Sequence, residues 1–464
     1  MKKFIFAICT SFTIAACSNQ VLLGEGDSKA SVVNAIPKNI IFIVGDGMGP
    51  AYTTAYRYYS DNPKTAEVEQ TVFDRHLVGL SSTYPAPVSG YVTDSAAGAT
   101  ALSAGIKSYN GAIAVDVNKN EVQTVLELAK TLGKKTGVVV TSQVNHATPA
   151  SFLAHNRSRK NYNEIADSYI DSKINGQLKM DLLLGGGWKY FLREDRNLVN
   201  EFKQSGFQYI DKYEQLNSID ANKPVIGLFA DVGLPWALDD SDSHRLSAMT
   251  EVATKQLEND NGFFMLIEAS QIDWGGHSND IVAAMGEMDD LAKTLEYLEK
   301  YVAQNPDTLV VVTADHSTGG LTIAANGKYE WNPELIRTMK HTPKAIADKL
   351  THESITASLT ASLFNFDLTE QELTALIKVK HGSLVNVEEA GNPYKDKKAS
   401  KVNRKLYKAV KHIMDERTNT GWTSSGHTAI DVPVFAFGAS SSNFIGLNNN
   451  IDIANKMFSL LGRK

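Results

Sequence analysis

The sequence predicts an α/β fold in which a mostly parallel central sheet is flanked by helices on both faces. Seven short apolar runs are typical of buried strands, and segments with helical periodicity lie between several of them. In sheets of this kind, ligands bind beyond the carboxyl ends of the strands. The 464 residues are enough for one large core with an insertion, and 43% of them are hydrophobic, which excludes a disordered chain.

The predicted strands are short and rich in valine, isoleucine and leucine. In chain order they are 39–44, 137–141, 182–184, 225–229, 263–267, 309–313 and 434–437. Helical spacing of apolar residues marks 122–132 and 281–302. We therefore expect strands and helices to alternate along most of the chain.

The strand pattern disappears between residues 331 and 420, where short helices follow one another. Thr369 and Glu372 form a capping box that opens one of these helices. We interpret 331–420 as a helical insertion on an α/β core made of 37–330 and 421–464. The basic run 395–411 indicates a solvated helix face, with attraction of anionic substrates as the alternative.

The N-terminus predicts export. Two lysines precede an apolar run at 4–16 that is too short to span a bilayer, which is the pattern of a signal peptide at 1–16. The run ends in Ala-Ala-Cys17, which resembles a bacterial lipobox. We therefore expect a lipid anchor on Cys17, a tether at 17–36, and a location in the periplasm or at the outer membrane. A plain signal peptide cut nearby is the alternative.

Composition narrows the partners further. The formal net charge is −6, so the chain lacks the basic character that would indicate a nucleic acid as a specific partner. The two cysteines, Cys9 and Cys17, both lie in the N-terminal segment, so no internal disulfide is expected.

Acidic side chains and histidines stand beside several predicted strand ends. In chain order they are Asp46, Glu268, Asp273, His277, Asp315, His316 and His427. One turn of helix would bring Asp273 and His277 together, whereas Asp46 alone could equally be a ligand or a helix cap. Crowded carboxylates repel one another unless cations lie among them, so the joint pattern favours a polynuclear metal site.

The segment 91–101 contains a candidate nucleophile. Small residues after Ser95 suit a close-packed helix start, where free backbone amides and the helix dipole favour an anion. The alternative is that Asp94 or Ser95 only caps this helix. Further along lie Arg157, Arg159 and Lys160. An arginine there could bind phosphate oxygens bidentately, although a single arginine is usually a surface residue.

Taken together, these motifs resemble the alkaline phosphatases. The similarity runs in order along the α/β body and leaves out the insertion and the N-terminal segment. It covers Asp46, 93–97, 147–150, Arg159, 268–277, 313–316 and 426–428. The resemblance implies metal-dependent hydrolysis of phosphate monoesters through a phosphoserine on Ser95, with Arg159 holding the nonbridging oxygens of the phosphate.

The resemblance also implies three metal sites. One zinc would be held by Asp273, His277 and His427. A second zinc would be held by Asp46, Asp315 and His316, with Ser95 completing its ligands. A third site, usually magnesium, would use Asp46, Thr148 and Glu268. Nitrogen and oxygen donors suit zinc, and oxygen donors suit magnesium.

Two positions depart from the best-known bacterial pattern of this family. His146 stands where that pattern has an aspartate, and Trp274 stands where it has a lysine. Some cold-active members share this pair. We expect His146 at the third metal site to alter its choice of metal, and Trp274 at the substrate site to weaken phosphate binding; simple aromatic packing is the alternative for Trp274.

Other functions remain open at this point. A phosphodiesterase of the same superfamily is one alternative, and a noncatalytic surface lipoprotein that binds phosphate or zinc is another. A sulfatase is disfavoured because it needs a modified nucleophile in a Cys- or Ser-x-Pro-x-Arg motif, whereas Ser95 is followed by Ala-Ala-Gly. A homodimer is possible.

Overall fold

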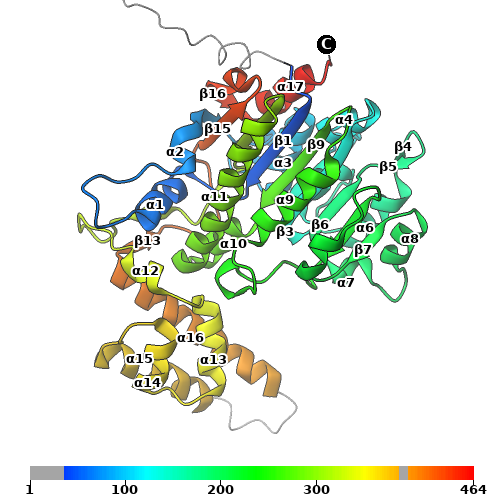
Figure 1. Ribbon diagram of the computed structural model, residues 1–464. Helices are drawn as coiled ribbons and strands as arrows, with labels where there is room; N and C mark the ends of the chain where they lie inside the picture. Colours follow the sequence, from blue (N-terminus) through cyan, green and yellow to red (C-terminus); the bar gives the residue numbers. More distant parts are fainter. Residues whose placement is uncertain (1–35, 386–394, 464) are drawn as a thin grey trace, which may run out of the picture.

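The computed structural model describes residues 36–385 and 395–463, and a ten-stranded sheet forms its centre (Figure 1). The strands are β1 (Asn39–Gly45), β2 (Leu77–Ser82), β3 (Lys135–Gln143), β6 (Leu182–Gly186), β7 (Gln208–Ile210), β8 (Val225–Leu228), β9 (Phe263–Ala269), β10 (Thr308–Thr313), β15 (Val432–Gly438) and β16 (Gly446–Asn449). Their order across the sheet is β16-β2-β15-β10-β1-β9-β3-β6-β8-β7.

The sheet is mostly parallel, as predicted. β1 pairs in parallel with β9 and with β10, and only β15 runs antiparallel to its neighbours β10 and β2. Successive side chains of a strand point to opposite faces, and β1 buries both sets. Ile41 and Ile43 belong to one hydrophobic core, and Ile40, Phe42 and Val44 belong to the other. This double burial explains why the strand is an unbroken apolar run.

All seven predicted strands are present, as β1, β3, β6, β8, β9, β10 and β15. The sequence patterns missed β2, β7 and β16. The last strand along the chain is therefore β16, which follows the predicted strand 434–437. β16 lies at the edge of the sheet with Leu447 75% exposed, so it lacks the apolar pattern of a buried strand. Two-stranded ladders complete the strands: β4 (Lys173–Ile174) with β5 (Gln177–Leu178), β11 (Ser317–Thr318) with β14 (His427–Thr428), and β12 (Leu321–Ile323) with β13 (Thr420–Trp422).

Helices cover both faces of the sheet (Figure 1). One face carries α1 (Pro50–Ser60), α2 (Val72–His76), α9 (Arg245–Leu257), α10 (Gln271–Ser278) and α11 (Ile281–Gln304). The other carries α3 (Ser95–Ala104), α4 (Val125–Thr131), α5 (Ala147–Leu153), α6 (Tyr162–Asp171), α7 (Trp188–Phe191), α8 (Leu198–Gln204) and α17 (Asn450–Leu460). The helix predicted at 281–302 is α11, and the one predicted at 122–132 is α4.

Helices fill the segment between β12 and β13. They are α12 (Glu334–Thr338), α13 (Pro343–His352), α14 (Ala357–Phe364), α15 (Glu370–Val385) and α16 (Lys395–Thr418). In Figure 1 they form a block below the sheet, at the end where α10 lies. The predicted capping box is present: the Glu372 amide donates to the Thr369 hydroxyl, and the Thr369 amide donates to the Glu372 carboxylate. Within the described residues, no helix combines the length and apolar character needed to cross a bilayer.

The predictions for the N-terminus fall outside the described residues. They are the signal peptide at 1–16, the lipid anchor at Cys17 and most of the tether at 17–36.

A buried arginine fixes the start of α10. The Arg245 side chain is fully buried and donates to Glu287 at 2.9 Å, to Asp290 at 2.8 Å and to the Gln271 side chain at 2.8 Å. Burial raises the pKa of Asp290 to about 7, and Arg245 opposes that rise. Because Gln271 is the first residue of α10, this network ties α10 to α9 and α11.

Arg245→Met is expected to lower the free energy of unfolding by about 3–5 kcal/mol, because it leaves the buried carboxylates of Asp240, Glu287 and Asp290 without their cation. Arg75 pairs with Glu299 at the surface, so Arg75→Met is the control and should cost less than about 1 kcal/mol. Urea unfolding of the two variants measures both. Equal losses would show that Arg245 has no special structural weight.

Candidate active site

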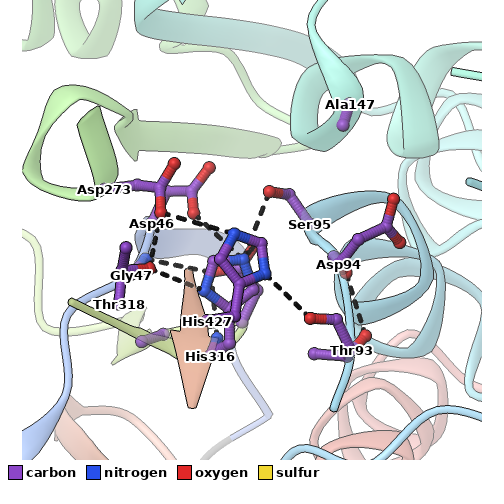
Figure 2. Close-up of polar contacts among 12 residues, drawn as sticks. Asp46, Gly47, Thr93, Asp94, Ser95, Ala147, Asp273, His316, Thr318 and His427 are labelled. Carbon is purple, nitrogen blue, oxygen red and sulfur yellow. Dashed lines mark hydrogen bonds and ion pairs between the residues drawn. The ribbon is translucent and has the colours of Figure 1, made fainter. Parts of the chain in front are cut away.

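Parallel pairing brings the predicted site residues together. β9, β1 and β10 are neighbours, so Glu268 in β9, Asp46 after β1 and Asp315 after β10 meet at one edge of the sheet. Figure 2 shows Asp46 and Asp273 on one side of the His316 and His427 rings and Ser95 on the other. The side chains predicted from separate segments therefore converge.

Asp46 is not a helix cap. The next helix, α1, has Gly49 at its N-cap and no side-chain cap hydrogen bond. Asp46 is fully buried, and neither of its carboxylate oxygens has a hydrogen-bond donor among the described residues. A buried carboxylate without a donor is costly, so this side chain needs a positive partner.

The Nε2 atom of His316 is surrounded by oxygen atoms. It lies 3.5 Å from Asp46 Oδ1, 3.3 Å from Asp315 Oδ2 and 3.2 Å from Ser95 Oγ. His316 is fully buried, and burial lowers its pKa well below the ordinary value. A neutral imidazole among carboxylates and a hydroxyl is a donor set that suits a divalent cation.

The Ser95 hydroxyl does not cap its helix, because the neighbouring Asp94 does. Asp94 is the N-cap of α3, and its Oδ1 atom accepts a hydrogen bond from the Ala97 amide at 3.0 Å. Ser95 is the first residue of α3 and is 1% exposed, and its hydroxyl faces His316. The helix-cap alternative therefore holds for Asp94 and not for Ser95.

Asp273, His277 and His427 form a second cluster. His277 Nε2 lies 3.3 Å from Asp273 Oδ2 and 3.1 Å from His427 Nε2. One turn of α10 joins Asp273 and His277, as predicted. The Nδ1 atoms of His277 and His427 lie 2.7 Å from the Ser425 carbonyl and 2.8 Å from the Thr93 carbonyl. Donation there leaves both Nε2 atoms as electron-pair donors that face each other.

A third group of candidate ligands adjoins Asp46 and includes Glu268 and His146. Glu268 is fully buried, and its Oε2 atom accepts hydrogen bonds from Ser270 at 2.5 Å and Ser142 at 3.2 Å. Burial raises the pKa of Glu268 to about 7, and the nearby Thr148 hydroxyl opposes this rise. Thr148 and His146 lie in and just before α5, which brings them to the same place as Glu268.

Arg159 and Trp274 both contact His146 in the third group. The Arg159 guanidinium donates to Asp94 Oδ2 at 3.1 Å and to His146 Nε2 at 3.2 Å. The Trp274 ring meets the His146 ring edge to face, with centroids 6.0 Å apart. Burial and the positive charge of Arg159 lower the pKa of His146 to about 3, so its ring is neutral.

The donor atoms fit a polynuclear metal site. In each of three sets of residues, the candidate ligand atoms lie within 4.8 Å of one another. The sets are Asp273 with His316 and His427, Asp46 with Asp315 and His316, and Asp46 with His146 and Glu268. His277 stands beside the first set through its contacts with Asp273 and His427. Burial and the charges of Asp315, Asp273 and Glu268 raise the pKa of Asp46 well above its ordinary value. Divalent cations remove this repulsion.

Sequence reasoning missed the side chains that orient these ligands. The Thr318 hydroxyl donates to Asp273 at 2.5 Å and lies 3.2 Å from His316 Nδ1. Thr318 follows His316 by two residues, so its nearness in sequence was the one available signal. Ser270 directly follows β9, two residues after Glu268, so it carried the same signal, whereas Ser142 lies in β3 and no local pattern connects it to Glu268.

Almost the whole chain matches one protein family. The model of that family, described as Alkaline phosphatase, matches residues 37–462. The chain belongs to the alkaline phosphatase family. This confirms the resemblance inferred from the motifs, and with it a metal-dependent enzyme.

Relatives from bacteria agree with this assignment. Alkaline phosphatase 3 of Bacillus subtilis (strain 168) is 48% identical over 427 residues, which are 91% of this chain and 89% of that protein. The cold-active alkaline phosphatase of a psychrophilic Shewanella sp. is 49% identical with a TM-score of 0.83, over 91% of this chain and 99% of that one. The chain is thus an alkaline phosphatase that hydrolyses phosphate monoesters, and its fold is that of the family.

A more distant solved structure is also similar to this chain. The alkaline phosphatase of the Antarctic bacterium TAB5 is 27% identical with a TM-score of 0.67, over 93% of this chain and 98% of that one. A variant of the TAB5 alkaline phosphatase, with one histidine replaced by glutamate, has Mg bound in the M3 site; it is 28% identical with a TM-score of 0.66.

Proposed function

We propose that Ser95 is the nucleophile of this alkaline phosphatase and carries the phosphoryl group between two displacements. Its oxygen bonds to phosphorus as the ester bond breaks and the alcohol leaves, and water then releases inorganic phosphate and restores the hydroxyl. The position of the hydroxyl supports this role: it lies at the N-terminus of α3 and 3.2 Å from the His316 ring. The helix dipole there favours the anionic substrate.

Two zinc ions and one magnesium ion fit the three groups of donors. Asp273, His277 and His427 would hold one zinc, and Asp46, Asp315 and His316 the other, beside Ser95. Asp46, Thr148 and Glu268, with His146 nearby, would hold magnesium. When bound, such ions favour the ionised serine hydroxyl and stabilise the attacking and leaving oxygens of the in-line displacement.

Arg159 would orient the phosphate. Asp94 Oδ2 accepts a hydrogen bond from one guanidinium nitrogen, and the Asp94 carboxylate is itself fixed as the cap of α3. Arg159 therefore has a defined position relative to Ser95. A planar guanidinium can donate to two phosphate oxygens at once, which holds phosphorus in line with the serine oxygen.

Metal removal tests the cation sites. A chelator should abolish activity and added zinc should restore it, with proton release on binding. Asp46, Asp315 and Glu268 have raised pKa values in the metal-free protein, so they bind protons that cations must displace. Zinc affinity should therefore rise with pH, and magnesium affinity at the third group should rise as the pH passes about 7, the pKa of Glu268. Calorimetry in buffers of different ionisation enthalpy measures this, and unchanged affinity without proton release would contradict the proposal.

His146 and Trp274 should set the metal and phosphate affinities together, because their rings are in contact. In the double variant His146→Asp, Trp274→Lys, a carboxylate joins the third group and an ammonium faces the phosphate. The inhibition constant for inorganic phosphate should fall about tenfold, the effect of one charge-assisted hydrogen bond, and the variant should retain more magnesium. The TAB5 variant with Mg in its M3 site supports this direction. An unchanged inhibition constant would leave Trp274 as a packing residue.

The organisation and location of the chain are also proposals. We propose a phosphatase core formed by 37–330 and 421–464, with 331–420 as a helical insertion. We further propose export under a signal peptide at 1–16 and a lipid anchor at Cys17, which places the enzyme in the periplasm or at the outer membrane. A homodimer is compatible with this arrangement.

A further inference from the structure

Helix α10 carries two of the proposed zinc ligands but is a weak helix by itself. It has eight residues, and two of them are the adjacent glycines Gly275 and Gly276. Each glycine inside a helix costs about 1 kcal/mol relative to alanine. Both are required by close packing: a Cβ at Gly275 would lie 3.0 Å from the Ala284 amide, and one at Gly276 would overlap the Tyr52 hydroxyl. His277 therefore follows directly on the least stable part of the helix.

The end of α10 is held from outside by helix α16. The Lys411 ammonium donates to the carbonyl of Ser278, the last residue of α10. A cation at the C-terminus of a helix is favourable because the last carbonyl groups lack partners within the helix. The ammonium also lies over the Tyr407 ring, 4.6 Å from its centroid, so the two side chains of α16 act as one unit.

The second contact of α16 fixes the junction that follows α10. Asp280 is 1% exposed and is the N-cap of α11, where its Oδ1 atom accepts from the Ala283 amide at 3.0 Å. Its other oxygen, Oδ2, accepts from the Tyr407 hydroxyl at 2.9 Å. Between Ser278 and Asp280, Asn279 turns the chain with a positive φ of 52°. Tyr407 and Lys411 thus hold both sides of this turn.

We infer that Lys411 and Tyr407 are positioning residues for the zinc bound by Asp273, His277 and His427. Helix α16 then supports the C-terminal end of α10, the helix that carries two of the proposed zinc ligands. Arg245 supports the N-terminal end of α10 through Gln271. The inference rests on the proposed ligand set. It requires that loosening the turn after His277 weakens this one zinc and leaves the zinc held by Asp46, Asp315 and His316 unaffected.

The test compares zinc release from purified holoenzymes. Lys411→Met keeps the aliphatic chain and removes the charge, and Tyr407→Phe removes only the hydroxyl. Lys408→Met is the matched control, because Lys408 is on the same helix and exposed. A chromogenic chelator records the release of each ion, and Asp273→Ala identifies which kinetic phase belongs to the proposed site.

In Lys411→Met and Tyr407→Phe, we expect one zinc to leave about tenfold faster, the lower end of effects seen for groups around metal ligands. The second zinc should leave at the wild-type rate, kcat at saturating zinc should be nearly kept, and Lys411→Arg should restore slow release. A purely structural role would lower the melting temperature without separating the two phases.

The inference is overturned if both variants release both ions at wild-type rates, or if both phases accelerate together. Should Lys411→Met not fold, Tyr407→Phe decides by the same criterion. If Asp273→Ala keeps both zinc ions at wild-type rates, the proposed ligand set itself is wrong, which is a result distinct from a failure of the support by α16.

Discussion

Ser95→Ala is expected to bind its metal ions normally and to lose at least about 10³-fold in kcat, because the phosphoryl group then has no serine oxygen to accept it. The Ser95 hydroxyl faces the His316 ring from the first turn of α3, while the cap of that turn comes from Asp94. The substitution therefore removes the reacting oxygen and leaves the helix cap and the cluster of carboxylates and imidazoles intact.

The measurement combines steady-state turnover with acid trapping. Wild-type enzyme quenched at acid pH during turnover should carry phosphate on the peptide that contains Ser95, and Ser95→Ala should carry none. Ser103→Ala, on the same helix but directed at the Thr100 carbonyl, is the control and should keep trapping and turnover. Near wild-type turnover by Ser95→Ala would refute the covalent role.

Asp46→Asn should lower the bound metal content more than any other single substitution. Ligand atoms of Asp46 belong to two of the three donor sets, and the carboxylate is buried without a hydrogen-bond donor among the described residues. The amide has one donor oxygen and no charge, so the zinc beside Ser95 and the ion at the third group should both be lost. We expect kcat to fall by at least about 10³-fold as well.

Metal analysis after gel filtration measures this outcome. The zinc content should fall from two ions per chain towards one, and magnesium should be lost. Asp195→Asn, an exposed carboxylate paired with Arg193, is the control and should leave metal content and turnover unchanged. Two zinc ions and full magnesium in Asp46→Asn would contradict the shared role of Asp46.

The parts of the fold that are buried on both sides were predictable from sequence. β1, β9 and β10 are apolar runs because helices cover both faces of the sheet, and the acids that follow them therefore meet at one edge. β2 and β16 were not predictable, since they lie near the exposed edge of the sheet, where burial leaves no continuous pattern.

The site divides in the same way. Candidate ligands at strand ends were predictable because acid and imidazole beside an apolar run form a local signal, as in Asp315 and His316. The choice between ligand and cap for Asp46 needed the three-dimensional structure. Contacts such as Lys411 with Ser278 join segments 133 residues apart, and nothing local in either segment points to the other.

Anomalous diffraction at the zinc absorption edge, from crystals of the holoenzyme, would locate the cations directly. We predict two zinc peaks roughly 3.5–4 Å apart, one between Asp273, His277 and His427 and the other between Asp46, Asp315 and His316, beside the Ser95 oxygen. Zinc peaks remote from these side chains, or no zinc within bonding distance of Asp46 and His316, would contradict the account of this site as a metal-assisted serine phosphatase.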